Sequence, residues 1–162
     1  MNTAYIAGFF DGEGCVNFTR CRQSLFPRVL ITNTNIEILQ KIQEKFGGDI
    51  KPLSLRKENW KQGYSLRISW SKAVEFLSEI YPYLFLKAAQ AETVFAWDAI
   101  RIGSGKKTLQ KKEEYKDSCD LLYRRMKWLN QKGNKDTVDP IDEELHYQRL
   151  EKPERVDENE LR

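Results

Sequence analysis

Residues 64–70 alternate between apolar and polar side chains without interruption. One side of the extended chain carries only apolar residues, which we expect to face a core, namely Tyr64, Leu66, Ile68 and Trp70. The other side carries only polar residues, namely Ser65, Arg67 and Ser69. A strand with one buried and one solvated face is typical of an antiparallel sheet that is covered on one side.

Similar patterns along the chain predict an α+β domain with the element order α-β-β-α-β-β-α. A strand begins at Cys15 with Val16 and Phe18 inward, and Pro27 is expected to separate it from a second strand. The other predicted segments are a helix over 3–12, strands over 28–32, 49–57 and 64–70, and helices after Asn33, over 71–81 and over 87–102. Asn33, Thr34 and Asn35 all offer N-cap chemistry for the helix that follows, with Asn33 the most available, and Ser71 is the expected N-cap of the next helix.

The C-terminal third of the chain is predicted to add a helix and a tail to this domain, which spans 1–105. The helix lies within 106–132 and has a two-turn apolar seam of Tyr115, Cys119, Leu122, Met126 and Leu129. We expect the seam to pack on the body, because a free coiled coil would need more heptads. Residues 133–162 form an acidic tail, which is either disordered or draped over the body through Ile141, Leu145, Tyr147 and Leu150.

Composition excludes several classes of protein. With 162 residues, 40% of them hydrophobic and 31% charged, the chain can bury a core and is neither a membrane protein nor wholly disordered. No apolar run approaches the ~20 residues that cross a bilayer, and the N-terminus lacks the basic region of a secretory leader. Three cysteines do not make a disulfide framework and indicate a reducing, intracellular compartment, either the cytoplasm or an organelle matrix. The single histidine, His146, excludes a His-rich metal site.

Charge is distributed unevenly along the chain. Residues 136–162 carry ten acids and four bases, so that 23 of the 27 bases and only 14 of the 24 acids lie before them. A basic body of this size suits a polyanion such as nucleic acid, although a solvated surface kept soluble by charge explains the composition equally well.

The polar face of the predicted sheet is the candidate surface for nucleic acid. It collects hydrogen-bonding and cationic residues on the strands and near their ends, namely Asn17, Thr19, Arg20, Arg22, Arg28, Lys51, Arg56, Lys57, Ser65 and Arg67. Such side chains suit base edges and phosphates in a major groove. An ordinary solvated face is the alternative, but such a face normally mixes both signs of charge.

The first helix breaks two local rules. Ala4, Gly8 and Gly12 are four residues apart and share one helical face, which lets another backbone approach closely. Two glycines weaken the helix by roughly 1 kcal/mol each relative to alanine, and Asp11 and Glu13 lie at the end where the macrodipole disfavours acids. Such conflicts mark function or unusual packing; a tight core helix with a glycine C-cap is the alternative.

The segment Ile6-Ala7-Gly8-Phe9-Phe10-Asp11-Gly12-Glu13-Gly14 resembles the LAGLIDADG motif of homing endonucleases. The element order agrees with that family, and Tyr81-Pro-Tyr-Leu-Phe-Leu-Lys87 resembles its Pro-x-Leu-x-x-Lys stretch. The resemblance covers roughly residues 3–102 and implies a concave antiparallel sheet that forms a saddle on DNA. A single motif in a short chain implies the homodimeric type, and small features suggest the archaeal ribosomal-RNA-intron branch of the family, without a diagnostic residue.

The resemblance also implies a function. It implies a site-specific endonuclease that makes a double-strand break in a long, pseudo-palindromic DNA target and is encoded within an intron or intein. Ala4, Gly8, Gly12 and Asp11 would lie at the homodimer interface, with Asp11 structural and a candidate cap for the partner's helix. Glu13 would bind Mg²⁺ or another divalent cation, with the Gly12 carbonyl as a further ligand.

Two more polar residues are candidates for the catalytic site. The resemblance assigns Lys87 and Asn33 to ordering the attacking water and phosphate, although Lys87 is also explicable as a surface lysine and Asn33 as a cap. No small-molecule cofactor and no membrane partner are expected. The basic helix is expected to add phosphate contacts through Lys111, Lys112, Arg124, Arg125 and Lys127.

Two other functions remain open from the sequence. The first is a non-cleaving protein with the same fold, either an RNA maturase or a DNA-binding regulator. The second is a generic interaction domain whose small-residue helix is only a dimer seam. Retention of Glu13 and Lys87 favours the enzyme over the first alternative.

Overall fold

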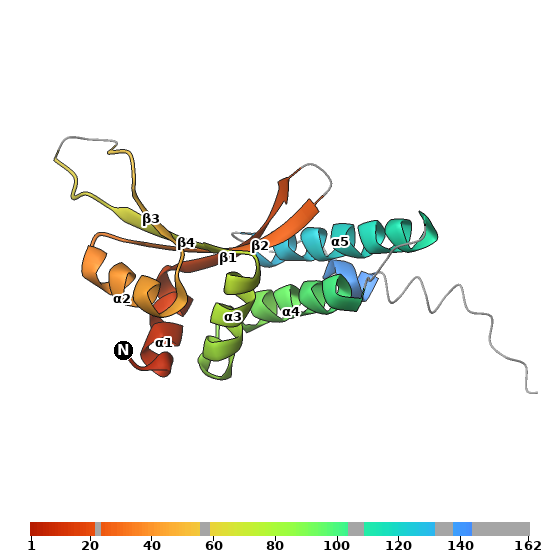
Figure 1. Ribbon diagram of the computed structural model, residues 1–162, viewed down its shortest axis with the longest axis horizontal. Helices are drawn as coiled ribbons and strands as arrows, with labels where there is room; N and C mark the ends of the chain where they lie inside the picture. Colours follow the sequence, from red (N-terminus) through yellow and green to blue (C-terminus); the bar gives the residue numbers. More distant parts are fainter. Residues whose placement is uncertain (22–23, 56–58, 104–108, 132–137, 144–162) are drawn as a thin grey trace, which may run out of the picture.

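The computed structural model describes residues 1–21, 24–55, 59–103, 109–131 and 138–143, and only the backbone of 109–111. Four strands form one antiparallel sheet in the order β1-β2-β4-β3. The strands are β1 (Gly14–Cys21), β2 (Ser24–Asn33), β3 (Asp49–Pro52) and β4 (Tyr64–Ser69). The sheet is a curved layer whose two ends rise away from the helices beneath it (Figure 1). The predicted α+β architecture and element order are confirmed.

The helices pack on one face of the sheet. They are α1 (Thr3–Glu13), α2 (Ile36–Phe46), α3 (Ser71–Ile80), the short 3₁₀ helix η1 (Tyr81–Tyr83), α4 (Ala88–Gly103) and α5 (Leu109–Leu129). In the part of the chain that the structure describes, no helix is both long and apolar enough to cross a bilayer.

The alternation of the strands fixes which face meets the helices. Val16, Val29, Ile31, Leu66 and Ile68 are at most 1% exposed and all point toward the helices. The helices contribute residues of the same kind to this core, including Ile6, Phe10, Leu39, Ile42, Phe76, Leu77, Val94 and Trp97. The expected inward positions of β1 and of β4 up to Ile68 are therefore confirmed.

The expectation that Pro27 separates the first two strands is wrong, because the second strand runs through it. It lies inside β2, opposite Phe18 of β1, and its carbonyl oxygen accepts a hydrogen bond from the Trp70 N–H at 3.1 Å. The N–H and C=O of a strand residue point to the same side. The missing N–H of Pro27 therefore faces the end of β4, where the loss of a ladder bond costs little.

The strand predicted over 49–57 is shorter than expected. β3 ends at Pro52, although the next backbone N–H, that of Leu53, still donates to the Gly63 carbonyl at 2.8 Å. Residues 53–55 are not in a strand, and 56–58 lie outside the described residues. A short edge strand of this kind offers little unpaired backbone to another chain.

Of the candidate N-caps, Asn35 is confirmed, whereas the preferred Asn33 and Ser71 are wrong. The cap of α2 is Asn35, whose side chain accepts from the Glu37 N–H at 3.0 Å, while Asn33 Oδ1 accepts from the Asn35 N–H at 2.9 Å. Ser71 is the first residue of α3, and Trp70 takes the cap position without a side-chain hydrogen bond.

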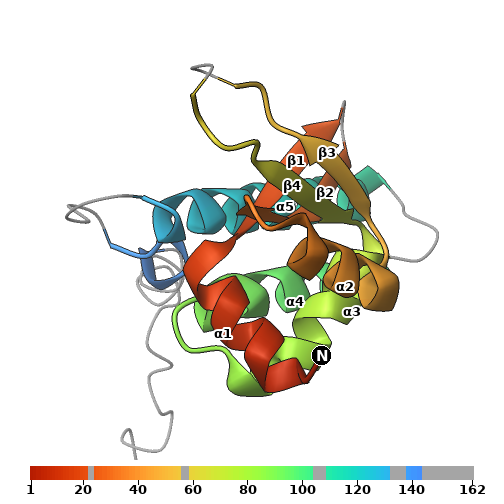
Figure 2. The same cartoon turned by 90° about the vertical axis from the view of Figure 1, so that its left-hand side faces the viewer.

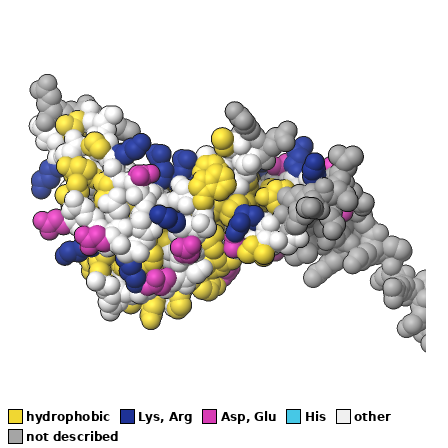
Figure 3. Space-filling model, viewed as in Figure 1, with side chains coloured by type: hydrophobic (Ala, Val, Ile, Leu, Met, Phe, Trp, Pro, Cys, Tyr) yellow, Lys and Arg dark blue, Asp and Glu magenta, His cyan; other side chains and the backbone are white. Residues whose placement is uncertain are grey.

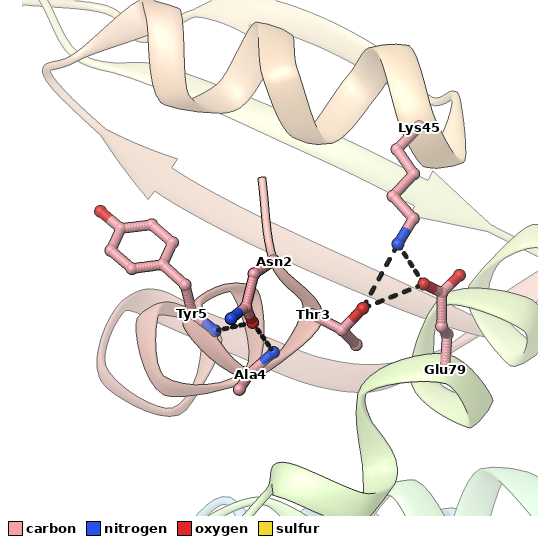
Figure 4. Close-up of polar contacts among 6 residues, drawn as sticks. All are labelled: Asn2, Thr3, Ala4, Tyr5, Lys45 and Glu79. Carbon is pink, nitrogen blue, oxygen red and sulfur yellow. Dashed lines mark hydrogen bonds and ion pairs between the residues drawn. The ribbon is translucent and has the colours of Figure 1, made fainter.

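A polar cluster ties α1, α2 and α3 together at the end of the molecule opposite α5 (Figure 4). Lys45 Nζ contacts Glu79 Oε1, and the Thr3 hydroxyl donates to the same oxygen at 3.2 Å. The hydrogen bond from Lys45 lowers the pKa of Glu79 below its ordinary value of 4.5. Asn2 begins α1 by accepting from the Ala4 and Tyr5 N–H groups.

The last helix packs beside the sheet rather than standing free. Cys119, Leu122 and Met126 of its predicted seam are buried, and Asn130 Nδ2 donates to the Val16 carbonyl of edge strand β1 at 2.7 Å. Of the tail, residues 138–143 are described, and there Asp139 pairs with Arg125 at 3.1 Å and Ile141 packs on the core. Leu145, Tyr147 and Leu150 lie outside the described residues.

Candidate functional site

The C-terminal end of α1 brings the candidate site residues together. Glu13 is the last residue of α1, and both Gly12 and Glu13 are exposed. The Gly14 N–H closes the helix on the Phe10 carbonyl, and β1 starts at once, with Gly14 opposite Ile31 of β2. The helix therefore ends where β2 also ends.

Lys87, which directly precedes α4, also lies at this end of α1. Its Nζ donates to the backbone carbonyl of Asp11, and it lies 5.9 Å from the centre of the Phe10 ring. A cation at the carbonyl end of a helix is favoured by the macrodipole. The ammonium is thus held two residues before Glu13 and does not project freely from the surface.

Asp11 organises this arrangement within its own chain. Its Oδ2 accepts from the Phe85 N–H at 2.7 Å and its Oδ1 from the Lys87 N–H at 3.0 Å. Its carboxylate therefore holds the segment that precedes α4, whereas a capping contact with the partner's helix stays a prediction. Sequence reasoning missed this role, because residues 85 and 87 are more than 70 positions away and no local pattern connects them.

Asn33 lies at the same end of the sheet, two residues beyond the point where β2 faces Gly14. It is half-buried, and its Oδ1 is engaged by the Asn35 N–H. Gln90, one turn after Lys87, has a buried Oε1 that no described donor satisfies.

Helix α1 lies on the outside of the molecule (Figure 2), and its small-residue face is exposed. Ala4, Gly8 and Gly12 are exposed, and a Cβ added at either glycine would meet nothing within 4 Å. Large apolar side chains flank this face: Tyr5 is 56% exposed, and Phe85, in the segment that Asp11 holds, is 88% exposed. These two side chains expose much of their apolar surface on one chain.

The solvent face of the sheet carries most of the predicted polar residues. Asn17 pairs with Arg28 and Arg28 with Ser69 across three strands, while Lys51 pairs with Ser65. The face also carries Asp49 and apolar side chains, so its pattern is less purely cationic than the sequence analysis expected. On the side of the molecule where the sheet lies, Lys and Arg side chains are interspersed with hydrophobic side chains (Figure 3).

Arg20 does not belong to this face. It shares its side of β1 with Val16 and Phe18, and its guanidinium pairs with Asp120 of α5 at 2.5 Å and lies 4.3 Å from the centre of the Tyr123 ring. Thr19 does lie on the solvent face, opposite Phe26. Arg22, Arg56 and Lys57 lie outside the described residues.

The described residues of one chain contain no group of three or more acidic, His or Cys side chains that could hold a metal ion. Glu13 and the neighbouring backbone carbonyls are hard oxygen donors of the kind that Mg²⁺ takes. One chain therefore supplies the right donor type in too small a number for a complete site.

Comparison with known proteins decides the family. The family model of the LAGLIDADG-like domain matches residues 1–81, half of the chain, and includes α1, the whole sheet and α3. The chain belongs to this family. No curated protein matches it.

Solved structures agree on the fold of this LAGLIDADG-like chain. The homing endonuclease I-CvuI, in complex with the I-CreI target, is 23% identical with a TM-score of 0.63, over 93% of this chain and 95% of that one. The archaeal intron-encoded homing endonuclease I-Vdi141I, complexed with DNA, is 21% identical with a TM-score of 0.57, over 87% and 94%. I-GzeII, in complex with its DNA target, is 14% identical with a TM-score of 0.60. The match covers 91% of this chain but only 50% of that protein. The fold is that of the LAGLIDADG homing endonucleases.

Proposed function

We propose that the protein is a homodimeric, divalent-metal-dependent, site-specific endonuclease that makes a double-strand break in DNA. The observation that carries the proposal is the position of Glu13: an exposed carboxylate at the end of a helix whose uncovered face is made of small residues. Two such helices packed together would bring two Glu13 carboxylates close to one another at a twofold axis.

The homodimer is supported by the surface of α1 and its surroundings. The added-Cβ positions at Gly8 and Gly12 are empty in one chain, although glycine weakens a helix. Close approach of a second backbone would explain why glycine occupies both positions. Phe85 and Tyr5 would gain cover from the same contact.

A divalent cation fits the donor set once two chains contribute. Each chain would supply Glu13 and the Gly12 carbonyl, and the second copy would supply the other carboxylate that one chain lacks. When bound, Mg²⁺ supplies positive charge against the negative charge that develops on a phosphodiester during hydrolysis.

The chain's own residues would orient the DNA and the water. The Lys87 ammonium is held beside the helix end by the Asp11 carbonyl, where it would stabilise the scissile phosphate as a fixed point charge. Asn33, at the end of β2, retains its amide N–H donors for the attacking water or the phosphate. The sheet face of Asn17, Arg28, Ser65 and Arg67 would occupy the major groove of one half-site, so that the target is pseudo-palindromic.

The test is a selection of bound and cleaved sites from a randomised duplex DNA library with the full-length protein. Wild type is expected to enrich one pseudo-palindromic sequence and to break it in the presence of Mg²⁺. Glu13→Gln should bind the enriched duplex and leave it intact, whereas Glu44→Gln, an exposed glutamate of α2 on the helical side, should cleave like wild type.

Three results would count against the proposal. Enrichment of a duplex that wild type binds tightly and never cleaves would favour the non-cleaving regulator. Preference for RNA over duplex DNA would favour the maturase. Absence of any enrichment would contradict nucleic-acid recognition altogether.

A further inference from the structure

Trp70 is the one described non-glycine residue with a positive φ, at 62°. With ψ at −139°, this backbone conformation is one that glycine adopts readily and that strains a residue with a side chain. The conformation is fixed from both sides, because the Trp70 N–H donates to the Pro27 carbonyl at 3.1 Å and the Trp70 carbonyl accepts from Ala73 N–H at 3.0 Å. Strain that persists in this way is concentrated at functional positions.

The strained backbone moves the Trp70 ring to the solvent face of the sheet. Strand alternation would turn it toward the core, as the sequence analysis expected, but instead it stacks on Phe26 with ring centres 4.1 Å apart and planes inclined by 11°. Phe26 is only 8% exposed, while Trp70 is 51% exposed. The result is a rigid apolar plate on the face that carries the polar DNA-binding candidates.

A cationic side chain, Arg28, lies beside this plate. The Arg28 guanidinium lies 5.8 Å from the centre of the Phe26 ring, and its cross-strand partners are Asn17 and Ser69. Burial, and then the Arg67 guanidinium, lower the pKa of Arg28. Its buried Nε has no acceptor among the described residues.

Resting on the function proposed above, we propose that the Phe26–Trp70 plate contacts the 5-methyl group of a thymine in each half-site of the target. The thymine methyl is the one large apolar feature that base edges present in the major groove. Base edges and phosphates also offer acceptors that suit the cationic Arg28 guanidinium beside the plate. Trp70 thereby becomes a specificity-determining residue of this particular chain.

The experiment uses the full-length protein and the randomised duplex library, with three proteins selected in parallel. They are wild type, Trp70→Gly and Ile102→Ala. Glycine accepts a positive φ without strain, so the fold of Trp70→Gly is expected to persist. Ile102 is the matched control, because it is equally apolar and 69% exposed but lies at the end of α4.

Wild type and Ile102→Ala are expected to enrich thymine at one symmetry-related pair of positions, and Trp70→Gly to lose that preference alone. A duplex with deoxyuridine at those two positions should then bind wild type about fourfold more weakly per half-site, the effect of one lost methyl contact. Trp70→Gly should bind the thymidine and deoxyuridine duplexes equally.

The outcomes separate this inference from the proposed function. If wild type enriches and cleaves a site but Trp70→Gly selects the same bases at every position, or deoxyuridine has no effect, the thymine contact is wrong and the endonuclease stands. If wild type enriches nothing, the proposed function fails and the inference fails with it.

Discussion

At the scale of single residues, Asp11 connects the motif helix to the segment that carries Lys87. Asp11→Ala removes the acceptor for the Phe85 and Lys87 N–H groups. We expect the free energy of unfolding to fall by about 1–3 kcal/mol, because backbone donors lose their partner. Urea denaturation at one fixed protein concentration measures this.

The control for that variant is Glu13→Gln, an exposed neighbour on the same helix. Its unfolding free energy should stay within about 0.5 kcal/mol of wild type, as for most surface substitutions. Equal stability of Asp11→Ala and wild type would show that the carboxylate does not hold residues 84–88.

The ion pair of Glu79 and Lys45 predicts a pH dependence of stability. Because the folded pKa of Glu79 lies below its ordinary value of 4.5, the pair stabilises the fold above that value. The contribution is lost as the pH falls through the folded pKa. The stability difference between wild type and Glu79→Gln should therefore shrink in acid, as measured by urea denaturation at several pH values.

Glu75→Gln, an exposed glutamate on the same helix, serves as the control for this titration. Its stability should follow that of wild type across the same pH range. A Glu79→Gln difference that is constant from neutral pH to acid would argue against the ion pair.

Some site residues were accessible from the sequence and others were not. Glu13 and Lys87 stand in motifs whose spacing is local, so their candidacy needs no tertiary information. The choice between Asn33 and Asn35 as a cap depends on where β2 ends, which spacing leaves open by two residues. The turned-out ring of Trp70 depends on one backbone dihedral, and the alternation of β4 gives no hint of it.

At the scale of secondary-structure elements, a substitution on the small-residue face of α1 should have two opposite effects. Gly8→Ala should favour the helix within one chain by about 1 kcal/mol, since nothing lies near the new methyl group. The same methyl group should weaken the dimer, because it keeps two copies of α1 apart. Sedimentation equilibrium should find Gly8→Ala monomeric at concentrations where wild type is dimeric.

Gly103→Ala provides a matched comparison, because its added Cβ also meets nothing, at the end of α4. It should leave the dimer unchanged. If Gly8→Ala dimerises as well as Gly103→Ala does, the interface lies elsewhere than on this face.

Element order and burial followed from periodicity, while element ends did not. The inward residues of β1 and β4 up to Ile68 were predictable, because alternation records the position of the core. Pro27 misled, because a proline inside a strand is tolerated where its missing donor faces the end of the neighbouring strand. That condition depends on strand order and cannot be recognised from the sequence alone.

At the scale of the whole molecule, the sheet face predicts how salt affects DNA binding. If Arg67 contacts a phosphate in each half-site, Arg67→Gln should reduce the slope of log affinity against log salt by about 2 per dimer. Fluorescence anisotropy with the selected duplex over a salt series measures this slope.

Lys41→Gln, an exposed lysine of α2 on the helical side, should leave the slope unchanged. An Arg67→Gln slope identical to wild type would remove Arg67 from the phosphate contacts. Equal losses in both variants would indicate a general effect of net charge rather than contact through the sheet face.

The central claim is that two copies join along α1 and place two Glu13 carboxylates on one DNA target. Native mass spectrometry of the full-length protein with its selected duplex tests this most directly, because it counts the chains on each DNA molecule. We expect two chains per duplex, and a protein that is also dimeric without DNA. A single chain bound to a duplex that it still breaks in both strands would contradict the account.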